Sequence, residues 1–195
     1  ALMALSVVAV SLKKKAWSAL FVFLGAFFYA IVYTVWLKRR TWLNIVFGGL
    51  AGSWAVLAGA TAADPQLGAV PLALALVLFL WTPPHFWSLA IAFRDDYTAA
   101  GVPMLPVVVG DQRAANTILF STLALVAASL LPLAFGLGAI YFAGAASGGF
   151  LFIQKAWRLT REPNRKSAMV CFHASLMQLT LVLLGAIVDT QLRFW

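Results

Sequence analysis

The sequence predicts an all-α, polytopic transmembrane helical bundle. Of its 195 residues, 63% are hydrophobic and only 10% are charged. The mean hydropathy of +0.93 is too high for an apolar core inside a polar shell. Apolar segments of about 20 residues recur, which is the length that a helix needs to cross a bilayer. The strands of a membrane barrel would alternate apolar and polar residues, and these segments do not. Helices are therefore the expected way to satisfy the backbone in lipid.

Six complete spans and one partial span are expected in a single domain covering residues 1–195. The complete spans run approximately from Ala16 to Trp36, Leu43 to Ala63, Gly68 to Phe93, Ala114 to Phe135, Ala139 to Trp157 and Ser167 to Val188. The segment from Ala1 to Ser11 is apolar but too short to cross, and it lacks the features of a signal peptide. Since the sequence begins without methionine, we expect it to be truncated at its front.

Small residues recur at helical spacing in two of these segments. The second span carries Gly48, Gly52, Ala55 and Gly59, and the fifth carries Gly144 and Gly148. Small side chains let neighbouring membrane helices approach closely, so both sets are interpreted as packing positions.

The basic residues predict the orientation of the bundle. Ten of them fall on one side of the membrane and four on the other. The larger group comprises Lys38, Arg39, Arg40, Arg94, Arg113, Lys155, Arg158, Arg161, Arg165 and Lys166. The smaller group comprises Lys13, Lys14, Lys15 and Arg193. The larger group is expected in the cytoplasm. The formal net charge of +8 is spread over membrane loops, which favours anionic lipid and excludes nucleic acid as a partner.

Several common chemistries are excluded. The sequence contains no phosphate-binding glycine loop, no nucleophile elbow and no His-Glu zinc motif. Cys171 is the only cysteine and lies in an apolar segment, so it is interpreted as packing.

The third span and the loop after it carry the most informative residues, WTPPHFWSLAIAFRDDYTAAGVPMLP. Pro83 and Pro84 free backbone carbonyls and predict a bend beside His85. His85 should lie about 12 Å below the cytoplasmic end, partnered either by a neighbouring helix or by a ligand. If the helix persisted to Asp96, His85 and Asp96 would share one face, because eleven residues are close to three turns.

The carboxylates of this loop suit a divalent cation. Asp95 and Asp96 are adjacent on a loop of about twenty residues, and hard carboxylate oxygens suit Mg²⁺. Asp111 precedes a helical segment and is interpreted as an N-cap, while Glu162 is interpreted as a solvated loop charge. His173 is a weaker candidate than His85 for ligand contact.

The connection YTVWLKRRTWLN carries three consecutive cations, Lys38 to Arg40. They either mark the cytoplasmic side or bind a diphosphate, for which arginine offers a matching fork and lysine a compact charge. Cations facing a carboxylate site above an apolar cavity suit an enzyme that acts on lipid diphosphates.

Two segments, VYTVWLKRRTWLNIVFGGLAG and PHFWSLAIAFRDDYTAAGVPMLPVVVG, resemble the UbiA-like intramembrane prenyltransferases, in the branch that farnesylates protohaem IX. The resemblance implies nine helices, two acidic motifs and a bacterial plasma membrane protein whose active face is cytoplasmic. It also implies that farnesyl diphosphate alkylates a vinyl group of haem b while water adds, giving haem O for haem-copper terminal oxidases. Mg²⁺ would be the cofactor and haem b a substrate, with haem A synthase or terminal-oxidase assembly as candidate partners.

The resemblance also implies roles for individual residues. Asp95 and Asp96 would bind the metal, and both would act in catalysis together with Tyr97. The diphosphate would be contacted by Lys38, Arg39 and Arg94. His85 would face haem, and the matching substrate-binding positions would be those of Tyr33, Thr34 and Asn44. The first two helices and the first acidic motif of the family are expected to be absent, so the segment alone should be inactive. The stretch SWAVLAGATAADP replaces a proline pair and an Ile-Gly-Trp run of the family, which bears on the shape of the second span.

Two other hypotheses remain open at this point. A related prenyltransferase acting on an aromatic or quinone precursor would share the acidic and basic loops. A haem-binding redox or carrier protein would use His85 and His173 instead.

Overall fold

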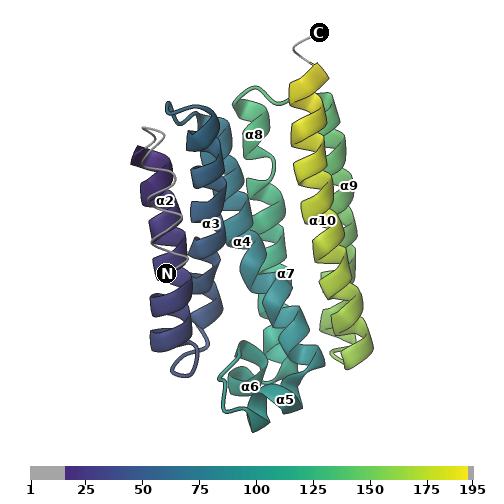
Figure 1. Ribbon diagram of the computed structural model, residues 1–195. Coiled ribbons are helices and arrows are strands. Elements are labelled where there is room, and N and C mark those ends of the chain that lie inside the picture. The colour runs from purple at the N-terminus through teal and green to yellow at the C-terminus, as the bar shows by residue number, and fades with distance from the viewer. Residues whose placement is uncertain (1–15, 193–195) are drawn as a thin grey trace.

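The computed structural model describes residues 16–192, and that range is helical without any strand (Figure 1). Its elements are α2 (Ala16–Phe27), η1 (Phe28–Leu37), α3 (Asn44–Ala63), α4 (Ala69–Ala92), α5 (Arg94–Ala99), α6 (Leu105–Val109), α7 (Asp111–Ala128), α8 (Leu131–Ala134), α9 (Ala139–Arg161) and α10 (Arg165–Leu192). The predicted fold class is confirmed. The segment Ala1 to Ser11, the lysines Lys13 to Lys15, and Arg193 lie outside the described residues.

Five helical segments in the described range are long and apolar enough to cross a membrane. They are Ala16–Leu37, Asn44–Ala63, Ala69–Ala92, Asp111–Ala134 and Arg165–Leu192. Each overlaps a predicted span, because the apolar stretch that must lie in lipid sets the length of the helix. Helix α9 covers the remaining predicted span with 23 residues but is not among these five, so its crossing stays a prediction.

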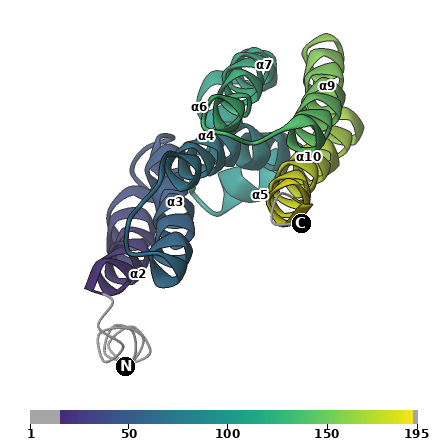
Figure 2. The same ribbon diagram turned by 90° about the horizontal axis from the view of Figure 1, so that it is seen from above.

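Helix α4 is the central element of the bundle. It contacts α3 on one side and α7 and α10 on the other, as the view from above shows (Figure 2). Twelve of its 24 residues are buried. The helix continues unbroken through Pro83 and Pro84, and the predicted bend stays a prediction.

Glycines allow the close approach of helices α9 and α10. A Cβ added at Gly144 would lie 2.6 Å from the carbonyl oxygen of Leu181, and one at Gly148 would lie 3.0 Å from Cα of Gln178. Packing is therefore confirmed as the role of both. On α3, a Cβ at Gly48 would contact Tyr33 and one at Gly52 would contact Leu78, whereas one at Gly59 would have no neighbour within 4 Å among residues 16–192. The packing interpretation of Gly59 stays a prediction.

Two predicted spans differ from straight α-helices. The first continues from α2 into η1, which is a π-helix of ten residues. The segment expected from Ala114 to Phe135 is divided into α7 and α8, with Ser129 and Leu130 in a turn. The hydroxyl of Ser129 donates to the carbonyl of Val126 at 2.7 Å, and Pro132 has no N–H with which to continue the helix.

Candidate active site

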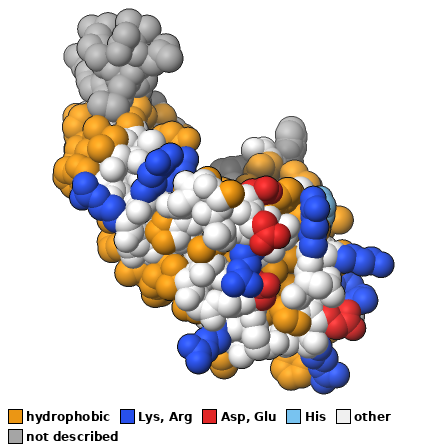
Figure 3. Space-filling view, turned by 90° about the horizontal axis from the view of Figure 1, so that it is seen from below, with side chains coloured by type: hydrophobic (Ala, Val, Ile, Leu, Met, Phe, Trp, Pro, Cys, Tyr) orange, Lys and Arg blue, Asp and Glu red, His pale blue; other side chains and the backbone are white. Residues whose placement is uncertain are grey.

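Charged side chains gather at one end of the bundle, which we call the α5 end. In the described range this end carries Lys38, Arg39, Arg40, Arg94, Asp95, Asp96, Asp111, Arg113, Lys155, Arg158, Arg161, Glu162, Arg165 and Lys166. A view onto this face shows acidic side chains lying among basic ones (Figure 3). The charges described at the opposite end are those of Asp64 and Asp189.

A polar cavity of about 320 Å³ opens where α4 ends. Its lining comprises Ile91, Ala92, Phe93, Arg94, Asp95, Asp96, Asp111 and Arg165, and we call it the acidic cavity. Phe93 leaves the helical region with φ −121° and ψ 33°, and α5 starts at the next residue. The structure thus brings Arg94, Asp95 and Asp96 together at the mouth that the sequence predicts. Their side chains are exposed to solvent.

The break at Phe93 overturns one expectation. The helix that carries His85 does not persist to Asp96, so the two residues do not share one continuous helical face. The backbone of Phe93 leaves the helical region, so α5 takes a new direction from Arg94 onward. The ring of Phe93 lies beside Arg165, whose guanidinium carbon is 5.2 Å from the ring centre.

Asp111 is a member of this cavity that the sequence does not reveal. Gly110 precedes the helix with φ +83°, and Asp111 is the first helical residue without a side-chain capping bond. The predicted N-cap is therefore wrong. Oδ2 of Asp111 instead accepts a hydrogen bond from Nη1 of Arg94 at 3.4 Å, while its buried Oδ1 has no hydrogen-bond partner among the described residues. Asp111 follows Gly110 on the same connection between helices as Arg94. This shared connection is the one feature of the sequence that could have linked Asp111 to the site.

Arg165 is the second residue missing from the sequence-based site. It starts α10 and faces the acidic cavity across the ring of Phe93. The sequence places it among the cytoplasmic cations without linking it to Arg94, because seventy-one residues separate them. With Arg94 it gives the cavity two guanidinium groups, the side chain best matched to diphosphate oxygens.

Tyr97 lies at the edge of this region and is half-buried. Burial raises the pKa of Tyr97 above its ordinary value of 10.0. The phenol is therefore neutral at physiological pH and can donate a hydrogen bond. Its hydroxyl lies close enough to that of Tyr33 to interact electrostatically.

The basic loop from Lys38 to Arg40 is tied to α3 by Asn44. Nδ2 of Asn44 donates to the carbonyl of Lys38 at 3.1 Å. Asn44 is fully buried, and within residues 16–192 its Oδ1 has no hydrogen-bond partner. Arg39 is exposed and Lys38 partly so. The amide thus holds the loop in place, and the cations remain available to an anion.

Tyr33 and Thr34 take different positions on η1. Tyr33 lines a cavity of about 200 Å³ with Tyr29, Ile45, Gly48, Thr82 and Phe86, which we call the tyrosine cavity. Thr34 is exposed, and its hydroxyl donates to the carbonyl of Tyr29 at 2.7 Å. The Thr34 hydroxyl therefore forms its hydrogen bond within its own helix.

His85 is buried between aromatic rings and is partnered by a neighbouring helix. Trp81 stacks on one side with ring centroids 4.0 Å apart, and Phe172 stacks at 4.5 Å. Nδ1 lies 2.7 Å from Oγ of Ser175, whose own hydroxyl donates to the carbonyl of Phe172. Nδ1–H of His85 is therefore the donor to Ser175. His85 lines neither of these two cavities.

The other residues singled out in the sequence are His173, Cys171 and Glu162, and their contacts are those of ordinary packing or surface residues. His173 is exposed, with Nδ1 2.8 Å from the carbonyl of Met169. Cys171 is a buried free thiol, which agrees with its interpretation as a packing residue. Glu162 is exposed and lies 3.8 Å from Arg158, in keeping with a solvated loop charge.

The carboxylates of the acidic cavity fit Mg²⁺ if a diphosphate is bound beside them. In the described part of the chain, no group of three or more His, Cys, Asp or Glu side chains is arranged to hold a metal. Mg²⁺ is commonly held by one or two carboxylates together with substrate phosphates and water. Asp95 and Asp96 meet that requirement, and a bound diphosphate would offset the repulsion between the ion and Arg94 and Arg165.

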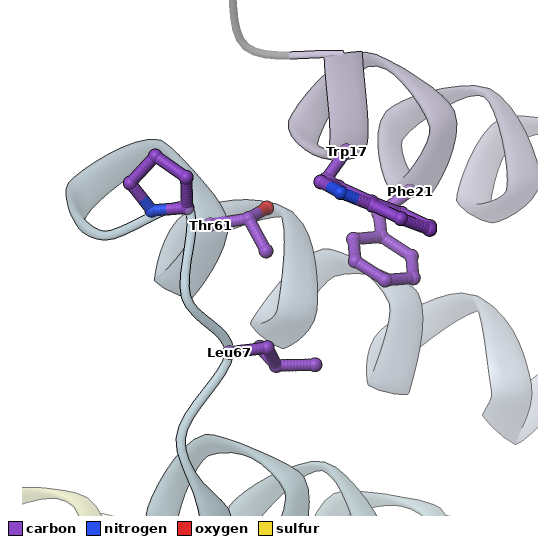
Figure 4. Close-up of a pocket in the computed structure, with 5 residues that line it drawn as sticks. Trp17, Phe21, Thr61 and Leu67 are labelled. Atoms are coloured by element: carbon purple, nitrogen blue, oxygen red, sulfur yellow. The ribbon is translucent and has the colours of Figure 1, made fainter.

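A third cavity, of about 280 Å³, lies at the opposite end of the bundle between α2 and α3. Trp17, Phe21, Thr61 and Leu67 point into it, with Pro65 completing its lining (Figure 4). The hydroxyls of Ser18 and Thr61 join the two helices at 2.9 Å. Its lining carries no charge, so it lacks the groups needed to bind a diphosphate.

Residues 1–182 match the model of the UbiA prenyltransferase family. The chain is 59% identical, over 98% of its length, to protoheme IX farnesyltransferase 2 of Paramagnetospirillum magneticum, and 54% identical over 88% to protoheme IX farnesyltransferase 1 of the same organism. A relative from Cenarchaeum symbiosum, protoheme IX farnesyltransferase 1, is 42% identical over 91%.

The chain covers 67%, 61% and 60% of these three relatives, so it spans about two thirds or less of their length. A solved structure from work on digeranylgeranylglyceryl phosphate synthase in membranes has the same fold. Its TM-score is 0.81 at 22% identity, over 96% of this chain and 66% of that one. The family match and the apolar helices establish a multi-pass integral membrane protein. The chain belongs to the UbiA prenyltransferase family.

Proposed function

We propose that the whole protein transfers a farnesyl group from farnesyl diphosphate to a vinyl group of haem b, giving haem O. The observation that carries this proposal is the 59% identity, along nearly the entire chain, to a protein named protoheme IX farnesyltransferase. The α5 end supports it, since guanidinium groups and carboxylates meet there beside a largely apolar cavity.

In this reaction the bond between C1 of the farnesyl group and the diphosphate oxygen breaks. C1 forms a bond to the haem vinyl group, and water supplies the hydroxyl while releasing a proton. Arg94, Arg165 and the loop cations Lys38 and Arg39 would offset the charge that develops on the leaving diphosphate. The neutral phenol of Tyr97 would donate a hydrogen bond at the same end.

Asp95 and Asp96 would hold Mg²⁺ together with the diphosphate. When bound, the ion supplies further charge neutralisation. The other sequence-predicted residues have indirect or separate roles in this proposal. Asn44 holds the basic loop, and Tyr33 lines the tyrosine cavity. His85 joins α4 to α10 through Ser175, and Thr34 bonds within η1.

The active end would face the cytoplasm of a bacterium and the spans would cross its plasma membrane, because the basic residues of the described range gather at that end. Haem O made there would pass to haem A synthase or to the assembly of a terminal oxidase.

Product analysis tests this proposal. Membranes containing the whole protein would receive farnesyl diphosphate, Mg²⁺ and an equimolar mixture of haem b and an aromatic or quinone precursor. We expect a haem product whose mass has increased by one farnesyl group and one hydroxyl group. A farnesylated aromatic product without haem O would favour the related prenyltransferase. A persistent bis-histidine haem spectrum without any transfer would favour a haem-binding protein instead.

A further inference from the structure

The helix that carries Tyr33 is wound more widely than an α-helix. All ten residues of η1 adopt the π form, and Lys38 N–H donates to the carbonyl of Tyr33 five residues earlier at 2.8 Å. π-Helices are rare, mostly a single turn long, and frequent at functional sites. The rings of Tyr29 and Tyr33 lie 5.9 Å apart between centroids. The π form thus presents two phenol rings to the same cavity.

The tyrosine cavity lies between η1, α3 and α4 and suits a hydrocarbon. The six residues that line it carry no charge, and most of the lining surface is apolar. The hydroxyl of Thr82 is already used, since it donates to the carbonyl of Leu78 at 2.9 Å. A flexible apolar chain is therefore the chemistry that this cavity accepts.

Gly48 fixes how closely the ring of Tyr33 approaches α3. A Cβ added at Gly48 would lie 2.9 Å from Cδ2 and 3.3 Å from Cγ of Tyr33. Contacts this short force the ring to move, because its inner atoms have little freedom. A methyl group at Gly48 would therefore both occupy space in the cavity and displace one wall.

The basic loop lies directly at one end of this cavity. Lys38 follows η1 and is hydrogen-bonded to Tyr33, while Asn44 binds the carbonyl of Lys38 one turn before Gly48. A molecule with a diphosphate at one end and a hydrocarbon chain at the other could place its diphosphate beside the loop. Its chain would then enter between Tyr33 and Gly48.

We infer that the tyrosine cavity receives the isoprenoid chain of the diphosphate substrate, and that the contact between Gly48 and Tyr33 limits the chain length the protein accepts. This inference rests on the proposed function for the class of donor, but it does not depend on the identity of the acceptor. Gly48 and Tyr33 are specificity-determining residues in this account.

Binding of non-hydrolysable analogues tests the inference without any acceptor. The probes are the thiolodiphosphates of geranyl, farnesyl and geranylgeranyl chains, with inorganic diphosphate as the fourth, measured on the whole purified protein. We expect Gly48→Ala to weaken binding of the farnesyl probe about tenfold and that of the geranyl probe much less, since one methyl group in an apolar pocket discriminates at this level. Binding of inorganic diphosphate should not change.

Gly52→Ala is the matched control. A Cβ at Gly52 would lie 3.2 Å from Leu78, one turn further along α3, and Gly52 does not line the tyrosine cavity. We expect its probe preference to equal that of the unchanged protein. Tyr33→Leu should restore farnesyl binding to the Gly48→Ala protein and, alone, should improve relative binding of the geranylgeranyl probe.

Equal weakening of all four probes by Gly48→Ala would overturn the inference, as would the same chain-length shift in Gly52→Ala. Haem O synthesis is measured separately on the unchanged protein. Its absence together with a Gly48-dependent chain preference would contradict the proposed acceptor and leave the chain cavity supported. Haem O synthesis without that preference would contradict the chain cavity alone.

Discussion

Nη1 of Arg94 lies 3.4 Å from Oδ2 of Asp111, and this ion pair joins the start of α5 to the start of α7. Both residues line the acidic cavity with Asp95, Asp96 and Arg165. The pair fixes a guanidinium beside two carboxylates that remain exposed. In the proposed reaction, Asp111 would act on the diphosphate through Arg94, as a positioning residue.

Asp111→Asn should raise KM for farnesyl diphosphate by up to about fivefold and leave kcat nearly unchanged. An exposed ion pair contributes about 0.2–1 kcal/mol, which corresponds to that range. Steady-state kinetics at saturating haem b measure the effect. Glu162→Gln removes a comparable exposed pair at the same end and should have no effect. A large loss of kcat in Asp111→Asn would instead mean that Asp111 contacts the reacting groups.

Tyr97→Phe should reduce turnover about tenfold, because it removes one hydrogen-bond donor to a charged group. Its raised pKa keeps Tyr97 protonated between pH 7 and pH 9, so the two proteins should have pH profiles of the same shape in that window. Above about pH 10 the unfolded chain loses this proton before the folded one, so Tyr97 lowers stability there. A change of activity with pH between pH 7 and pH 9 that disappears in Tyr97→Phe would contradict the role of Tyr97 as a protonated donor.

Gly144→Ala should lower the free energy of unfolding by about 1–3 kcal/mol, because the added methyl group would lie 2.6 Å from the carbonyl oxygen of Leu181 on α10. Thermal unfolding in detergent measures the loss. Gly59→Ala is the matched control, since no atom of the described residues lies within 4 Å of its added Cβ, and it should be neutral or slightly stabilising. Equal effects of the two substitutions would argue against close packing of α9 on α10.

Ser175→Ala should destabilise the bundle by about 1–3 kcal/mol, because it leaves Nδ1–H of buried His85 without its partner. Ser147→Ala is its control, since that exposed hydroxyl bonds only within its own helix. Haem O synthesis by the folded fraction should persist in both variants. Loss of turnover in Ser175→Ala at unchanged stability would place His85 in the substrate site.

Hydropathy predicts the membrane helices within a few residues, because the apolar length that fits lipid is written directly in the sequence. It does not predict η1, since an apolar segment has the same composition in the π and α forms. The division of α7 from α8 depends on Ser129 and Pro132, whose effect the apolar pattern conceals.

The site is predictable where its residues are adjacent in sequence. Arg94, Asp95 and Asp96 come from one turn of chain, and their charges at the end of an apolar helix identify them. Asp111 and Arg165 join them only through the tertiary fold. The partner of His85 lies ninety residues away on α10, so the sequence left open whether a helix or a ligand satisfies it.

We propose that the acidic cavity carries the chemistry of haem O synthesis, and Asp96→Asn is the sharpest test of that role. The substitution preserves size and removes one charge, so we predict a loss of haem O formation of at least about 100-fold, with folding unchanged. Asp64→Asn removes an exposed acidic charge at the opposite end and should retain full activity. Product quantification by mass spectrometry in membranes of matched protein content compares the two. Unchanged haem O formation by Asp96→Asn would contradict the account.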